Sequence, residues 1–184
     1  PENRELQIIR GSVDHLRALL QRTRMHTGRV VLSPDDCNVR ALFEQIIRET
    51  PHTDALRIEI DRCDDAPLYC DPSHVREALT NLVGNAVEAM RGSGRITLSY
   101  VRTARKAAVS VCDDGPGMTP AAQKRIFEPY YTTKTSGENF GLGLYYCQNV
   151  MNVHEGSIRV SSAPGKGCTF TLIFPLAAQG RRKP

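Results

Sequence analysis

The segment at residues 81–90 constrains the fold more than any other part of the sequence. It belongs to a helix predicted at about 73–91, which Asp71 or Ser73 can cap at its start. Apolar residues recur along it with the spacing of a buried helical stripe, and they are Val75, Leu79, Leu82, Val83, Ala86 and Met90. A helix with such a stripe must pack against a second layer of structure.

The same helix carries a polar face with two asparagines one turn apart, Asn81 and Asn85, flanked by Glu77 and Glu88. Asparagine is unfavourable inside a helix because its side chain competes for backbone hydrogen bonds. A solvated face explains most isolated pairs of this kind. Amide oxygens can also bind a hard cation such as Mg²⁺, which takes few protein ligands and completes its shell with water and phosphate. The downstream motifs favour the metal.

Composition predicts one globular domain. The 184 residues are 40% hydrophobic and 24% charged, enough for a substantial core. No apolar run approaches the roughly 20 residues that span a bilayer, no secretory signal is visible, and the first residues look like a fragment boundary. The net charge is +4, but Arg181, Arg182 and Lys183 supply three of those charges, so we expect no nucleic-acid partner.

The cysteines indicate the compartment. None belongs to a C-x-x-C motif, and several lie in apolar stretches, where cysteine behaves as a small hydrophobe. We expect neither a zinc site nor a disulfide framework, and we infer a reducing, cytoplasmic compartment. Whether the full-length protein carries a membrane anchor stays open. The cysteines are Cys37, Cys63, Cys70, Cys112, Cys147 and Cys168.

The order of predicted elements indicates an α+β fold. Helices are expected at 39–50, 73–91, 120–127 and from 141 to about 153. Strands are expected at 55–61, 68–70, 95–102, 107–112, 157–161 and 169–174. This order predicts a two-layer α/β sandwich, with helices over one face of a mixed, mostly antiparallel sheet.

A strand-to-glycine junction follows at Asp113. Asp113 is expected to end a strand, where a carboxylate with an unused acceptor suits the exocyclic amine of adenine. Gly115 and Gly117 permit backbone conformations and a close approach that a Cβ would block. The pattern D-x-G-x-G alone is often an ordinary turn.

A second glycine pair opens the last helix. Gly141 and Gly143 would leave free N–H groups and a positive dipole end for phosphates. The segment before them reads as a lid, in which Lys134 is the expected partner of a terminal phosphate. G-x-G alone is weak evidence, and a lysine in a loop is usually only solvated. The order of all these motifs carries the interpretation.

That order resembles the ATP-binding catalytic domain of bacterial sensor histidine kinases, in the GHKL (Bergerat) superfamily shared with gyrase and MutL. The resemblance covers about residues 29–176. Asn81 and Asn85 resemble the N box, and residues 113–117 the first glycine box. Residues 127–134 are similar to the F box of nitrogen-regulator-type kinases, and 141–144 to the second glycine box. The resemblance implies a GHKL sandwich with three helices and an ATP lid, and ATP and Mg²⁺ as cofactors.

The resemblance also implies roles for individual residues. Asn81, Asn85 and Lys134 would be catalytic, with Asn85 holding Mg²⁺, and Asp113 would read adenine. Glu88 would polarise a metal-bound water, although an exposed charge is the equal alternative. The other residues implied to contact ATP are Gly115, Gly117, Met118, Tyr130, Tyr131, Thr132, Thr133, Gly141, Leu142, Gly143, Leu144 and Thr169.

Three positions depart from the family pattern. Asp114 replaces the usual asparagine and would either repel phosphate or help to hold Mg²⁺. Cys168 replaces a threonine or serine near adenine, and a thiol is a weaker hydrogen-bonding group. Glu155 follows His154 where the family usually has glycine.

A phosphoacceptor histidine is missing from the resemblance. His15, the candidate on the first helix, is followed by Leu16 rather than an acidic residue, and it lies too close to Asn85 for an acceptor helix and its return helix. The 3.5-residue apolar period of that helix is typical of a coiled-coil seam, although packing on its own domain is the alternative. We therefore divide the chain into a remnant of a dimerisation and phosphotransfer helix at 1–28, a catalytic ATP-binding domain at 29–178 and a basic tail at 179–184.

The expected function is transfer of the γ-phosphoryl group of Mg-ATP to a histidine outside this chain, in a homodimeric sensor kinase with its own sensor domain and a response regulator. Asn81 stands where the hydrolysing branches have a water-activating glutamate, and asparagine cannot act as a base. The alternatives are a serine kinase of the anti-sigma kind, a GHKL ATPase and a module that binds nucleotide without catalysis. The stimulus, the cognate regulator, phosphatase activity and the oligomeric state of this fragment cannot be read from the residues.

Overall fold

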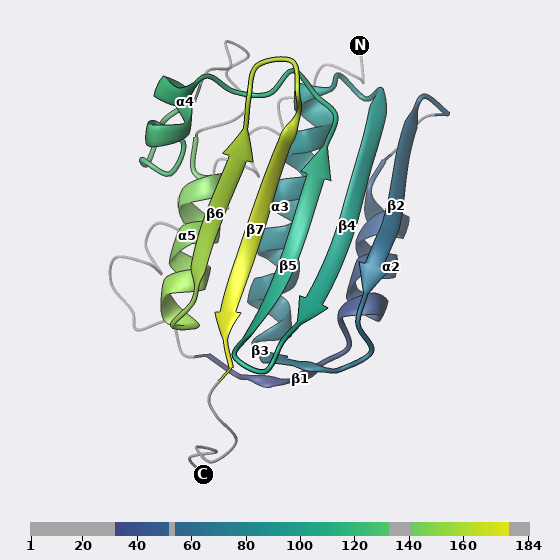
Figure 1. Ribbon diagram of the computed structural model, residues 1–184, viewed down its shortest axis with the longest axis vertical. Helices are drawn as coiled ribbons and strands as arrows, with labels where there is room; N and C mark the ends of the chain where they lie inside the picture. The colour runs from purple at the N-terminus through teal and green to yellow at the C-terminus, as the bar shows by residue number, and fades with distance from the viewer. Residues whose placement is uncertain (1–31, 52–53, 133–140, 177–184) are drawn as a thin grey trace, which may run out of the picture.

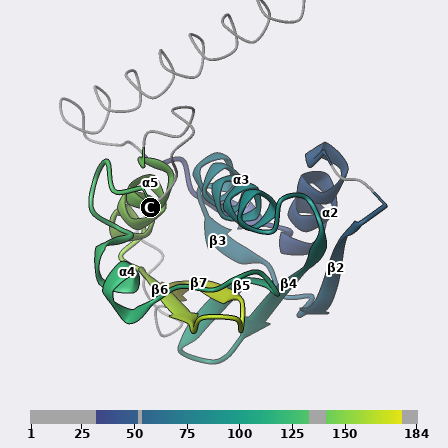
Figure 2. The ribbon, with the colours of Figure 1, turned by 90° about the horizontal axis from the view of Figure 1, so that it is seen from above.

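The computed structural model describes residues 32–51, 54–132 and 141–176, and these residues form two layers (Figures 1 and 2). Within this part of the chain one layer is a five-stranded sheet, made in spatial order by β2 (Leu56–Cys63), β4 (Gly94–Arg102), β5 (Lys106–Asp113), β7 (Cys168–Pro175) and β6 (Ser157–Ser162). The other layer consists of α2 (Val39–Glu49), α3 (Pro72–Ala89) and α5 (Gly143–Val153), which cover one face of the sheet.

The strand pairing is mixed and mostly antiparallel. In the described sheet β2 pairs with β4 in parallel, and the other neighbours pair antiparallel. The short strands β1 (Asp35–Cys37) and β3 (Leu68–Cys70) form a separate antiparallel pair, and the short helix α4 (Pro120–Arg125) lies beside β6 (Figure 2). The predicted α+β sandwich is therefore confirmed. The helix predicted at 1–28 and the tail at 179–184 lie outside the described residues.

Helix α3 forms where the sequence predicts it. Asp71 is its N-cap, accepting hydrogen bonds from the backbone N–H groups of Ser73 at 3.0 Å and His74 at 3.1 Å. Pro72 at the first position suits a helix start. The residues that α3 buries against the sheet are Val75, Ala78, Leu79, Leu82, Val83 and Ala86. The polar face therefore points away from the core.

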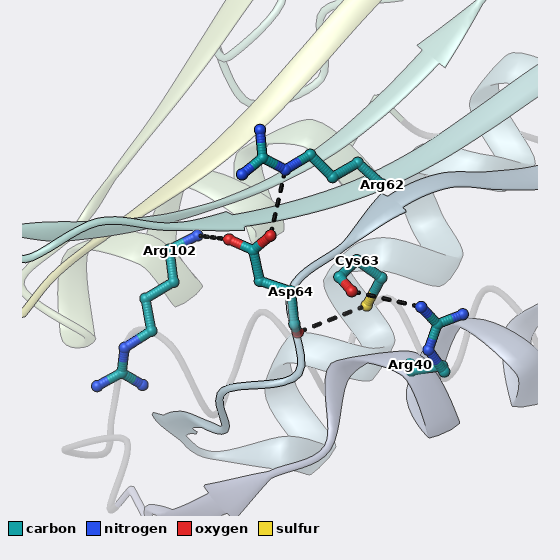
Figure 3. A network of polar contacts seen from close by, with 5 residues as sticks. All are labelled: Arg40, Arg62, Cys63, Asp64 and Arg102. Atoms are coloured by element: carbon teal, nitrogen blue, oxygen red, sulfur yellow. Dashed lines mark hydrogen bonds and ion pairs between the residues drawn. The ribbon is translucent and has the colours of Figure 1, made fainter.

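A polar network closes the end of the sheet where β2 and β4 finish (Figure 3). The Asp64 carboxylate accepts from the backbone N–H of Arg102 at 2.8 Å and from Arg62 Nε at 3.2 Å, and these contacts hold the pKa of Asp64 below its usual range. Arg40 on α2 donates to the carbonyl of Cys63 at 3.3 Å. The network joins α2, β2 and β4, and it lies far from Asp113 because Arg102 and Asp113 stand at opposite ends of the β4–β5 ladder.

All six cysteines lie in the described ranges and carry free thiols. No helix in those ranges is both long and apolar enough to cross a membrane.

Candidate functional site

The N-terminus of α5 lies against the middle of α3. A Cβ at Gly143 would come within 3.1 Å of Asn81 Oδ1. Asn81 Nδ2 donates to the carbonyl of Glu77 at 3.0 Å, so the amide oxygen faces α5. Leu142, at the N-cap position of α5, provides no side-chain cap. The first N–H groups of α5 therefore present a positive helix end to an anion.

The C-terminal end of α3 lies against the first glycine motif, at residues 113–117. A Cβ at Gly115 would lie 3.1 Å from Met90 Cγ and 2.8 Å from Asp113 Oδ1. Asn85 is half-buried and stands on α3 between Asn81 and Met90. The structure therefore brings both asparagines, the glycine loop and the N-terminus of α5 to one region.

Asp113 is a buried carboxylate at the end of β5, with 8% of its surface exposed. Its Oδ1 accepts from the backbone N–H of Gly115 at 3.0 Å, and the backbone N–H of Cys168 also donates to the carboxylate. Burial still raises the pKa of Asp113 above its ordinary value, with Asp114 adding to the rise, because the donors replace only part of the lost water. One further donor, such as the exocyclic amine of adenine, would stabilise the ionised form.

The first glycine motif interlocks with the turn between β6 and β7. Gly117 has φ +66°, and a Cβ there would lie 2.0 Å from the carbonyl oxygen of Ala163. Gly167 has φ +70°, and its Cβ would lie 1.9 Å from the carbonyl oxygen of Asp113. Gly167 N–H also donates to the carbonyl of Gly115 at 3.0 Å. Only glycine fits both positions, so the backbone around Asp113 is held in one arrangement.

Met118 is joined to the same turn between β6 and β7. Its backbone N–H donates to Ser162 Oγ at 2.8 Å, and Ser162 in turn donates to the carbonyl of Gly167 at 2.7 Å. Sequence reasoning missed Ser162. The signal that could have found it is the glycine-rich turn at 163–167. Ser162 directly precedes this turn, where a hydroxyl can bond both to the turn and to the backbone packed against it.

Within the predicted lid, Tyr130 and Tyr131 meet its last residue, Gly141. Tyr130 N–H donates to the carbonyl of Gly141 at 3.1 Å, and a Cβ at Gly141, where φ is +65°, would lie 2.6 Å from the carbonyl oxygen of Tyr131. The Arg125 guanidinium lies 4.6 Å from the centre of the Tyr131 ring. Tyr131 is therefore fixed at the base of the segment, whereas Tyr130 is exposed.

Three of the remaining predicted residues lie in the described ranges, and two lie outside them. Leu144 is partly buried against the core, while Thr132 and Glu88 are exposed. Thr133 and Lys134 lie outside the described residues, and their roles stay predictions.

Thr169 lies on the face of the sheet opposite to Asp113, and its contact with ATP stays a prediction. Residues of a strand alternate between the two faces of a sheet, and Cys168 and Phe170 are the buried neighbours of Thr169. Cys168 is directly opposite Asp113, whereas Thr169 is opposite the exposed Cys112. The side chain on the same face as Asp113 is therefore Cys168, whose thiol has its pKa raised to about 12 by burial and stays protonated.

Asp114 contacts the start of β4. Its Oδ1 accepts from the backbone N–H of Arg95 at 2.9 Å, and a Cβ at Gly94 would lie 2.5 Å from the same oxygen. One oxygen of the Asp114 carboxylate therefore holds the start of β4, and the two roles considered for this residue stay predictions.

The donors suit a metal that the nucleotide itself helps to hold. No group of three or more His, Cys, Asp or Glu residues in the described ranges could bind a metal ion. The available ligands here are amide oxygens on α3, and Mg²⁺ accepts one or two protein ligands when phosphate and water supply the others. Asn85, with support from Asn81, fits that requirement.

Comparison with known proteins shows the family. The family model described as histidine kinase-, DNA gyrase B- and HSP90-like ATPase matches residues 70–178. The signal transduction histidine-protein kinase AtoS of Escherichia coli (strain K12) is 41% identical over 118 residues, 64% of this chain and 19% of AtoS. The adaptive-response sensory kinase SasA of Rippkaea orientalis (strain PCC 8801 / RF-1) is 32% identical over 165 residues, 86% of this chain and 42% of that protein. The chain spans less than half the length of either relative.

Solved structures give the same result. Full-length ShkA in complex with AMPPNP superposes with a TM-score of 0.80 at 26% identity, covering 95% of this chain and 39% of ShkA. The catalytic domain of the histidine kinase ThkA superposes with a TM-score of 0.67 at 27% identity, covering 78% of this chain and 96% of that domain.

Proposed function

Since the chain belongs to the family of histidine kinase-, DNA gyrase B- and HSP90-like ATPases and carries the ATPase domain of a sensor histidine kinase, we propose that it transfers the γ-phosphoryl group of Mg-ATP to a histidine outside this chain. The observation that carries the proposal is the position of α3, which bears Asn81 and Asn85 between the uncapped N-terminus of α5 and the buried Asp113.

Each part of the site has one task. Asp113 accepts a hydrogen bond from the exocyclic amine of adenine, while the N–H groups at the start of α5 bind phosphate oxygens. Asn85 would hold Mg²⁺, and Asn81, whose amide oxygen faces Gly143 at the start of α5, would be directed toward the same phosphates. Bound Mg²⁺ would neutralise charge on the phosphates, which is most of what phosphoryl transfer requires besides positioning. Lys134 is proposed to contact the γ-phosphate.

Transfer is favoured over hydrolysis. Asn81 donates its amide N–H to Glu77 and has no basic atom with which to activate water. This observation argues against a GHKL ATPase. A serine kinase of the anti-sigma kind shares the fold, but the named relatives AtoS and SasA are a histidine-protein kinase and a sensory kinase.

The partners follow from the same proposal. The phosphoacceptor helix and the sensor domain would belong to the same full-length protein, which would act as a homodimer and pass phosphate to a response regulator. A cytoplasmic location is consistent with six free thiols.

A single assay tests the reaction. This chain would be mixed with a longer form that carries the acceptor helix and with labelled ATP. We expect acid-labile phosphate on histidine and little free phosphate. Asn85→Ala should abolish the Mg²⁺ dependence of ATP binding, as measured by titration with and without the metal. Rapid phosphate release without labelled protein would instead support the ATPase.

A further inference from the structure

Helices α3 and α5 are joined by a chain of three polar side chains. The hydroxyl of Tyr146 on α5 donates to Glu77 Oε2 on α3 at 2.5 Å. His74 Nδ1 lies 3.1 Å from the same hydroxyl. Because the phenol has one proton and directs it to the carboxylate, His74 Nδ1–H must donate to the phenol oxygen. Two residues one turn apart on α3 are therefore tied to one residue of α5.

The central member of this chain is locked in its donor form. Tyr146 is buried, with 5% of its surface exposed. Burial, and next the hydrogen bond to Glu77, raise the pKa of Tyr146 far above its ordinary value. The phenol therefore stays protonated at physiological pH and keeps the proton that it donates to the carboxylate.

Glu77 links this chain to the nucleotide site. Its side chain accepts from Tyr146, and its backbone carbonyl accepts from Asn81 Nδ2 at 3.0 Å. Tyr146 stands three residues after Gly143, whose Cβ position lies 3.1 Å from Asn81 Oδ1. The same glutamate thus holds the asparagine and the first turn of α5.

We propose that Tyr146 and Glu77, with His74 behind them, are positioning residues that set the N-terminus of α5 against Asn81 so that both can engage the phosphates of ATP. This inference rests on the proposed function. An apolar pair would pack α3 on α5 without the cost of desolvating a carboxylate. A hydrogen bond to a charged group adds direction and distance to the contact, which a phosphate-binding helix end requires.

The test is Tyr146→Phe in this 184-residue chain, which keeps the ring and removes the hydroxyl. Tyr145→Phe is the matched control, because the neighbouring hydroxyl takes no part in the chain of hydrogen bonds. Calorimetric titration with Mg-ATP should show the Kd of Tyr146→Phe raised roughly threefold to tenfold, which corresponds to the net contribution of about one hydrogen bond. The affinity for adenosine, measured by NMR, should match that of the unaltered chain.

A second pair of variants separates positioning from packing. Glu77→Gln keeps an acceptor for the phenol and should retain most of the Mg-ATP affinity, whereas Glu77→Leu should resemble Tyr146→Phe and add little to it in the double variant. Equal weakening of adenosine and Mg-ATP, or an unchanged Mg-ATP Kd in Tyr146→Phe, would overturn the positioning role while leaving the proposed function standing. Absence of Mg-ATP binding in the unaltered chain would overturn both.

Discussion

Asp71 and Asp113 are the two buried carboxylates among the described residues, and their pKa values are shifted in opposite directions. Burial acts to raise the pKa of both. At Asp71 the backbone N–H groups of Ser33, Ser73 and His74 outweigh it and hold the pKa below the ordinary value. At Asp113 burial prevails over the donors, and the pKa is raised.

The difference separates a structural end of the molecule from a functional one. Around Asp71 polar groups find partners within the chain: its own backbone N–H donates to His154 Nε2 at 2.9 Å, which joins the start of α3 to the end of α5. Around Asp113 the backbone is equally well held, yet the carboxylate keeps capacity for another donor. A buried group that the fold leaves incompletely stabilised is where a ligand gains most.

The largest expected effect is the loss of stability in Asp71→Ala. Removing the carboxylate leaves three backbone N–H groups without their acceptor, which should lower the free energy of unfolding by roughly 2–4 kcal/mol. Urea denaturation followed by circular dichroism measures this. Asp71→Asn should lose clearly less, since asparagine also caps helices. If Asp71→Ala lowered the free energy of unfolding no more than a surface control, Asp71 would not be the structural carboxylate that this comparison with Asp113 requires.

Asp113→Ala should reverse the pattern. We expect ATP affinity to fall by roughly 1.5–3 kcal/mol, the range for hydrogen bonds with a charged group. The free energy of unfolding near neutral pH should fall less than in Asp71→Ala, because the loss of an acceptor for the Gly115 and Cys168 N–H groups is offset by removal of a carboxylate whose raised pKa disfavours the folded state once it is ionised. The two measurements are an ATP titration and a denaturation curve on the same sample. Unaltered affinity would exclude Asp113 from adenine recognition.

Mild acid should weaken the structural end first. Burial lowers the pKa of His154, which accepts from Asp71 N–H in its neutral form. The unfolded chain therefore binds the proton more readily, so stability is complete above a pH of about 6.5 and falls below it, at no more than about 1.4 kcal/mol per pH unit for one proton. Denaturation between pH 7.5 and 5 should show a shallower slope in His154→Gln than in the unaltered chain.

The smallest effect is a gain. Glu155 has φ +55°, a left-handed conformation that costs a side-chain-bearing residue energy. Glu155→Gly should raise the free energy of unfolding by about 0.5–1 kcal/mol, after the greater flexibility of glycine in the unfolded chain is subtracted. ATP affinity should stay the same, since this turn lies at the far end of α5. A thermal melt with a lowered midpoint would contradict this reading of the departure from the family pattern.

Local patterns carried most of the fold prediction. The stripe on α3 and the alternation in β7 depend on residues a few positions apart, and the helices and strands formed where these periods indicated. The motif order also pointed to Asn81, Asp113 and Gly143, which the structure brings to one region. Contacts between distant segments could not be read from the sequence: Asp114 accepts from the start of β4, and Thr169 lies on the face of the sheet opposite to Asp113.

By itself, the order of residues determined the helices, the strands and the motif set of this protein, because hydrophobic periodicity and glycine chemistry act over short stretches of chain. Only the tertiary structure decided which polar groups are saturated. Asp71 and Asp113 look alike as aspartates after a strand, and the number of N–H groups that face each one depends on segments such as Ser33 and Cys168, far away in sequence. The pairing of Tyr146 with Glu77 arises in the same way, since α3 and α5 are far apart in the sequence and come together on one face of the sheet.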